Sequence, residues 1–116
     1  MHLSQYPQAI ANLQSQLFDL ELQLEQTQAM LKQIESEIDL NIAFNKELRN
    51  DSQRKAAKQQ QLDEHLHYWE QQEILSQTKA KREQVHIELG LRRNEFSVIK
   101  LERREAIAKL ELQAAS

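Results

Sequence analysis

Residues 10–38 read IANLQSQLFDLELQLEQTQAMLKQIESEI, and this stretch decides the fold. Its apolar residues recur at alternating spacings of three and four. That heptad pattern is typical of a helix that buries one stripe against another helix. The row consists of Ile10, Leu13, Leu17, Leu20, Leu24, Leu31, Ile34 and Ile38, with Thr27 in one slot. The stretch therefore predicts a long coiled-coil helix.

The composition favours long helices over a compact globule. The 116 residues include one Gly, one Pro and no Cys, so few tight turns can form and no thiol chemistry is available. The net charge of −3 disfavours general binding to nucleic acid. No stretch is apolar over the length of a membrane span, and the first residues lack the pattern of a signal peptide. We therefore expect a cytoplasmic protein without membrane contact.

One cluster of turn-forming residues interrupts the helical pattern. Asn50-Asp51-Ser52 suits both a turn and the N-cap of a following helix. We expect one helix over about residues 6–49, a turn at about 49–54 and a second helix over about 52–113. Together they would form a single coiled-coil domain spanning residues 1–116.

The second helix carries a less regular apolar pattern. Leu62, Leu66 and Trp69 predict a continuing core stripe, with Tyr68 at its rim. Farther on, Val85, Phe96 and Ile107 recur every eleven residues, which predicts a nearly straight stripe. Residues 85–101 also alternate between polar and apolar, so a β-hairpin is the alternative there. Helix-forming flanks favour the helix.

Charge predicts how the two helices pair. Residues 1–48 hold two Lys and seven acidic residues, whereas residues 79–111 hold nine basic and six acidic residues. An acidic arm complements a basic arm, so the fold class is an all-α, long antiparallel helical hairpin. Apolar residues outside one stripe further predict a homodimer that forms a four-helix bundle. The residues expected in the core or in self-association are Leu17, Phe18, Leu24, Leu31, Ile34, Ile38, Leu66, Trp69, Val85, Leu89, Phe96 and Ile99.

The chain lacks the residue patterns that accompany catalysis. It has no glycine-rich phosphate loop, no nucleophile elbow and no zinc-finger spacing. Asp63 and His67 are four apart and could share a helix face, but two ligands are too few for a metal site. We therefore expect no catalytic residue, no cofactor, no metal and no enzyme activity.

The leading functional hypothesis is a self-associating scaffold or adaptor that binds another, unidentified protein through its helix faces. The alternative is a nucleic-acid-associated protein, because basic pairs recur along the second helix and a basic cluster lies near the turn. The candidate contacts to an anionic partner are Arg82, Arg93, Arg104, Arg54 and Lys55. Acidic residues interspersed among these bases favour the scaffold.

Overall fold

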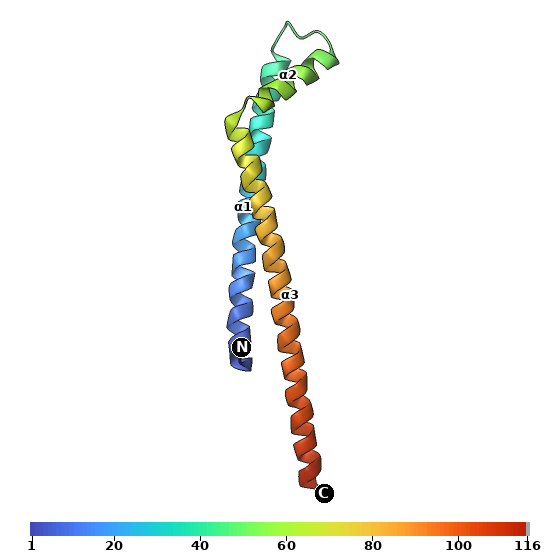
Figure 1. The fold of residues 1–116 in the computed structure, drawn as a ribbon. Coiled ribbons are helices and arrows are strands. Elements are labelled where there is room, and N and C mark those ends of the chain that lie inside the picture. The colour runs from blue at the N-terminus through green and yellow to red at the C-terminus, as the bar shows by residue number, and fades with distance from the viewer. Residues whose placement is uncertain (116) are drawn as a thin grey trace. The chain divides into compact units, whose positions relative to one another are not determined.

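The computed structural model describes residues 1–115, and this part of the chain is all-α, without a strand (Figure 1). A 3₁₀ turn at Leu3–Gln5 leads into α1, which spans Tyr6–Ala43; α2 spans Asp51–Asp63 and α3 spans Leu66–Ala115. The predicted all-α class is thus confirmed. The alternative β-hairpin at residues 85–101 is wrong, because α3 runs through that segment without interruption.

The first break between helices begins earlier than predicted. α1 ends at Ala43 instead of about residue 49, and the backbone N–H of Glu47 donates to Asn45 Oδ1 at 3.0 Å. Asparagine competes in this way with helical hydrogen bonding. α2 then begins after Asn50, whose Oδ1 accepts a bond of 2.8 Å from the N–H of Gln53. The N-cap predicted in this cluster is therefore present.

A second break was not predicted. The expected continuous helix over about residues 52–113 is wrong at Glu64 and His65, which separate α2 from α3. His65 caps α3, because its Nδ1 accepts a bond of 3.0 Å from the N–H of Tyr68. Trp69 Nε1 donates to the carbonyl oxygen of Asp63 at 3.2 Å. These two side chains bond backbone groups that the helix ends leave without helical partners.

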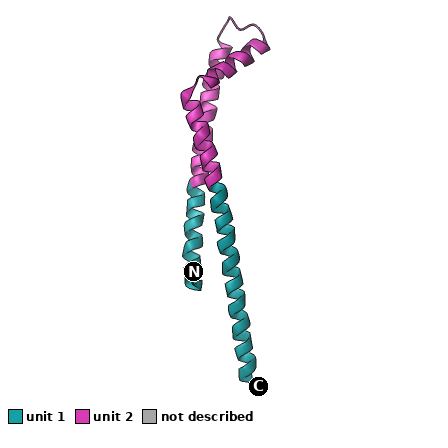
Figure 2. Cartoon of the chain, viewed as in Figure 1, with its two compact units in different colours: residues 1–19, 82–116 teal, residues 20–81 magenta. Residues whose placement is uncertain are grey.

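The chain divides into two compact units (Figure 2). The first unit combines Met1–Asp19 with the segment from Arg82 onward, and the second unit is Leu20–Lys81. Each unit contains parts of α1 and α3, and α2 lies in the second.

The second unit contains the main apolar cluster. Its buried members come from all three helices and are Leu31, Ile34, Ile38, Ile42, Leu62 and Tyr68. Along α1 in this unit, the buried positions run through Leu24, Thr27, Leu31, Ile34 and Ile38, at spacings of three and four. The heptad pattern thus marks the packed side of α1 here.

The two neighbouring aromatic residues of α3 reverse the predicted arrangement within the single chain. Tyr68 is 9% exposed, whereas Trp69 is 47% exposed and Leu66 is more exposed still. The expectation of Trp69 in the core and Tyr68 at the rim was wrong for this reason: the break at residues 64–65 restarts the helix in a different phase. Tyr68 consequently takes the inward position.

In the first unit, α3 packs through a heptad row that we call the inner row. It comprises Arg82, Val85, Leu89, Arg92, Phe96 and Ile99, all buried or half-buried. The eleven-residue repeat does not describe this packed side, since Ile107, its last apolar member, is exposed. Arginine can occupy such positions because its aliphatic stem covers apolar surface while the guanidinium reaches outward.

Candidate functional site

The start of α1 packs against α3 within the first unit through Tyr6. Tyr6 is buried, and its ring stacks on Phe96 with 5.5 Å between centroids and 9° between planes. Its hydroxyl donates to Glu95 Oε2 at 2.9 Å. Arg92 Nη1 approaches the same carboxylate oxygen at 3.0 Å, and Lys100 Nζ lies 4.3 Å from the Phe96 ring centroid. The Tyr6 hydroxyl and the Glu95 carboxylate are thus bonded to each other, and the carboxylate also accepts from Arg92.

The electrostatics of this contact favour a neutral phenol and a charged carboxylate. Burial raises the pKa of Tyr6, and the hydrogen bond to Glu95 raises it further. The hydrogen bond from Tyr6 lowers the pKa of Glu95, with a second contribution from the Arg92 hydrogen bond. The pair therefore keeps its hydrogen bond through the neutral pH range.

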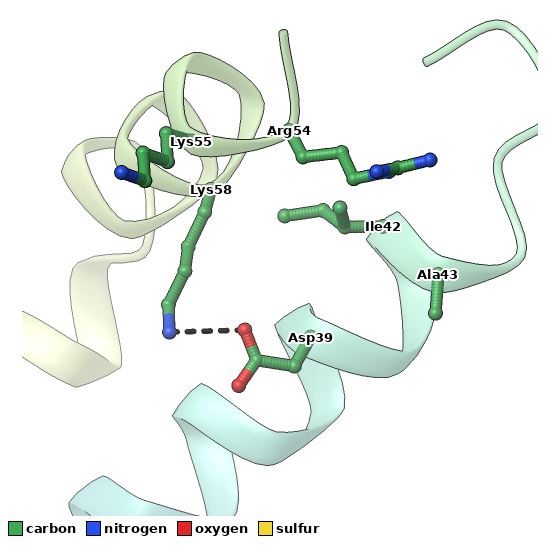
Figure 3. Close-up of a pocket in the computed structure, with 6 residues that line it drawn as sticks. All are labelled: Asp39, Ile42, Ala43, Arg54, Lys55 and Lys58. Carbon is green, nitrogen blue, oxygen red and sulfur yellow. Dashed lines mark ion pairs between the residues drawn. The ribbon is translucent and has the colours of Figure 1, made fainter. Parts of the chain in front are cut away.

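The second unit has an open hollow of about 490 Å³ where the end of α1 meets α2. Lys58 Nζ reaches across it to Asp39 Oδ1 at 2.9 Å, and this hydrogen bond raises the pKa of Lys58 (Figure 3). Arg54 and Lys55 point away from each other there, and Arg54 Nη1 pairs with Asp51 at 3.2 Å. The three cations do not converge on one point, so the hollow lacks the geometry of a phosphate site.

The histidine side chains of α3 and of the residues before it do not come together in one site either. His65 is committed to capping α3, and His67 Nδ1 lies 3.6 Å from Glu70 Oε2. Asp63 and His67, which the sequence suggested as neighbours on one face, lie on opposite sides of the helix break. Among residues 1–115, no three His, Cys, Asp or Glu side chains are grouped so that they could hold a metal ion.

The basic residues along α3 are partly paired within the chain. Arg92 contacts Glu95 at 3.0 Å and Glu88 at 3.8 Å, and Arg82 is half-buried in the inner row. Arg93 and Arg104 are exposed. Of the three predicted anionic-partner residues on α3, Arg82 is therefore partly covered in the inner row, whereas Arg93 and Arg104 are open to solvent.

Apolar residues on the opposite side of α3 form an exposed row, which we call the outer row. Each of its larger members is more than half exposed, and the apolar set is Ile87, Leu91, Val98, Leu101, Ala108 and Leu112. Two polar residues, Asn94 and Glu105, occupy the remaining positions of the same heptad spacing. This is an unusual amount of aligned apolar surface for a side that faces water.

The last part of α3 has no buried side. Residues 101–115 are helical and exposed on every side, including Ile107 and Leu110, which fall outside the outer row. A helical segment of this length is marginal in water without a packed face. No stretch of the helices in residues 1–115 is apolar enough over a sufficient length to cross a membrane.

The residues predicted for core or self-association fall into three groups within the single chain. Leu24, Leu31, Ile34, Ile38 and Leu89 are buried; Leu17, Val85, Phe96 and Ile99 are half-buried; Phe18, Leu66 and Trp69 are exposed. The sequence-based prediction missed the contact between Tyr6 and Phe96. The available signal was that one aromatic residue lies at the start of the first helix and another lies far along the second. The prediction also missed the capping by His65, for which no clear signal exists.

Comparisons with protein-family models, with curated proteins and with solved structures found no match to this chain.

Proposed function

We propose that the chain is a non-enzymatic coiled-coil protein that self-associates and serves as a scaffold or adaptor through helix–helix contacts. In this proposal α1 and α3 form an antiparallel hairpin, and two hairpins assemble as a homodimer in a four-helix bundle. Two contacts support the antiparallel pairing. In the first unit Tyr6 meets Glu95, and in the second unit the hydroxyl of Tyr68 donates to Glu35 Oε1 at 3.4 Å. Later residues of α1 thus pair with earlier residues of α3.

The observation that carries the proposal is the exposed apolar surface of α3. The outer row and the end of the helix leave leucine, isoleucine and valine side chains open to water over residues 87–112. Burying each of them would stabilise an assembly by about 1.5 to 3 kcal/mol when burial is complete. A second helix laid along the row would cover the apolar members of the outer row, and the marginal end of α3 would gain the packed face that it needs.

The partly paired bases also support a protein partner over a nucleic acid. Phosphate tracking needs cations spaced along one open face, and here Arg92 is already bonded to Glu95 and close to Glu88. Aromatic side chains for base stacking are likewise missing from the outer row. A scaffold requires neither feature.

Sedimentation equilibrium of the full chain over a range of concentrations tests the proposal. We expect a reversible association to twice the single-chain mass of 13.7 kDa. Weak interfaces still associate at protein concentrations up to about 1 mM. A single-chain mass at every concentration in that range would contradict the proposal.

A further inference from the structure

The apolar and polar residues of the outer row follow a symmetric order along the helix. Its positions alternate by three and four residues from Ile87 to Leu112, and the polar members Asn94 and Glu105 lie on either side of the Val98–Leu101 centre. Read from either end, the row gives the same succession: large apolar, apolar, polar, apolar. A surface with this symmetry is complementary to a copy of itself that runs in the opposite direction.

The outer row is also separate from the side of α3 that packs inside the chain. Leu89 of the inner row is buried, yet it follows the exposed Ile87 by only two residues. Residues two apart on a helix point about 200° from each other. Contacts with the first segment of α1 therefore leave the outer row uncovered.

We propose that the outer row is a dimerisation seam that binds the outer row of a second copy of this chain in the antiparallel direction. In this register Val98 faces the partner's Leu101, Leu91 faces the partner's Ala108, and Ile87 faces the partner's Leu112. The inference rests on the proposed self-association and adds its surface, direction and register. Because the outer row lies opposite the inner row, the two copies meet through α3 alone along this seam, and the paired helices form a layer in place of a four-helix bundle.

The two polar members of the row fix the direction. In the antiparallel register, Asn94 faces the partner's Glu105, so the amide N–H of one can donate to the carboxylate of the other. A parallel pair in register would instead place Glu105 against its own copy inside the seam. Two carboxylates at that distance repel each other. The sequence of the row is therefore compatible with one direction and opposed to the other.

The flanking charges agree with this register at the ends of the seam. Glu88 comes beside the partner's Lys109 in the antiparallel pair, whereas a parallel pair brings Arg104 beside the partner's Lys109. Nearer the centre, Glu95 comes close to the partner's Glu102. Arg92 already pairs with the Glu95 carboxylate within its own chain, and the Tyr6 hydroxyl donates a hydrogen bond to it.

Spin-label distances in the full chain test the direction and the register. The chain has no cysteine, so single labels can be attached to Arg93→Cys and to Ala114→Cys, at equivalent heptad positions of α3. In the proposed register the two labels at residue 114 are offset along the axis by about 44 Å, and those at residue 93 by about 20 Å. In a parallel pair in register, neither label has an axial offset.

Pulsed dipolar measurement should therefore give a distance about 20 Å longer for residue 114 than for residue 93, using 1.5 Å per residue. Equal distances in a sample of dimeric mass would overturn the antiparallel seam and leave the proposed self-association standing. A chain that remains a monomer would overturn both. Any other pair of distances in a dimer would refute this register.

A matched pair of leucine substitutions tests which face is used. Leu101 belongs to the outer row and is 55% exposed; Leu110, on the same helix, lies off the row and is 64% exposed. We expect Leu101→Gln to raise the Kd of the dimer about a thousandfold, because each dimer loses two buried leucines. Leu110→Gln should change it less than about fivefold. Equal effects of the two substitutions would overturn the assignment to the outer row.

Discussion

Replacement of Ile38 by alanine probes the packed side of α1 most sharply. Ile38 is 4% exposed and belongs to the buried cluster of the second unit. The substitution removes three carbon atoms worth about 0.8 kcal/mol each and leaves a partly collapsing cavity, so we expect a loss of about 3 kcal/mol in the free energy of unfolding. Ile38→Val removes one carbon and should cost about 1 kcal/mol.

Leu40 provides the matched control. It lies two residues further along the same helix and is 57% exposed, so Leu40→Ala should cost less than about 1 kcal/mol. Urea unfolding followed by helical circular dichroism, at one fixed protein concentration, measures both. With a slope of about 1.5 kcal/mol per molar urea, the midpoint should fall by about 2 M for Ile38→Ala. A loss at Leu40 as large as that at Ile38 would refute the burial pattern.

Three further predictions concern other parts of the chain. The pKa of Glu95 in the folded chain is lowered from its ordinary value of 4.5, so the stability that its carboxylate contributes is complete above pH 4.5 and is lost as the pH falls through the lowered pKa. Acid unfolding of Glu95→Gln should not show this loss. His65→Ala should destabilise the start of α3 by about 1 kcal/mol in thermal unfolding, and His65→Asn, which can still cap, should recover most of it. An unchanged stability of His65→Ala would contradict the capping. Arg93→Glu combined with Arg104→Glu should leave the sedimentation of the chain with added duplex DNA unchanged, whereas loss of a salt-sensitive complex in this variant would favour the nucleic-acid alternative.

The sequence predicted the helical class and the packed side of α1 because one apolar period dominates residues 10–38. Leu31, Ile34 and Ile38 are buried where that period places them. Asn50 could also be identified, since asparagine caps helices through a bond to the following turn. These are local signals, and local signals suffice for a long regular helix.

The second break could not be predicted because its neighbours suggest continuity. Leu62, Leu66 and Trp69 are spaced by four and three, as in an unbroken heptad row. The actual break depends on the bonds made by the side chains of His65 and Trp69 to backbone groups. Such bonds form only when the chain has already turned, and they shift the row so that Tyr68 takes the inward place.

The sequence did not reveal which side of α3 packs within the chain, because some residues on that side are polar. Counting apolar residues overlooks Thr78, which is buried with its hydroxyl donating to the carbonyl oxygen of Ile74 at 2.7 Å. It also overlooks Arg82 and Arg92, whose stems occupy the inner row. With these polar residues included, the spacing along α3 is a heptad, and the apparent period of eleven loses its support.

Hydrogen exchange over residues 101–115 tests directly whether a second copy covers the end of α3. Residues 101–115 are exposed on every side, so in a monomer their amides should exchange almost as fast as in an unfolded peptide. If a second copy covers the helix, exchange should slow by orders of magnitude and should slow further as the protein concentration rises. Fast exchange of these amides at every concentration, alongside protected amides around Ile34 and Ile38, would contradict the account.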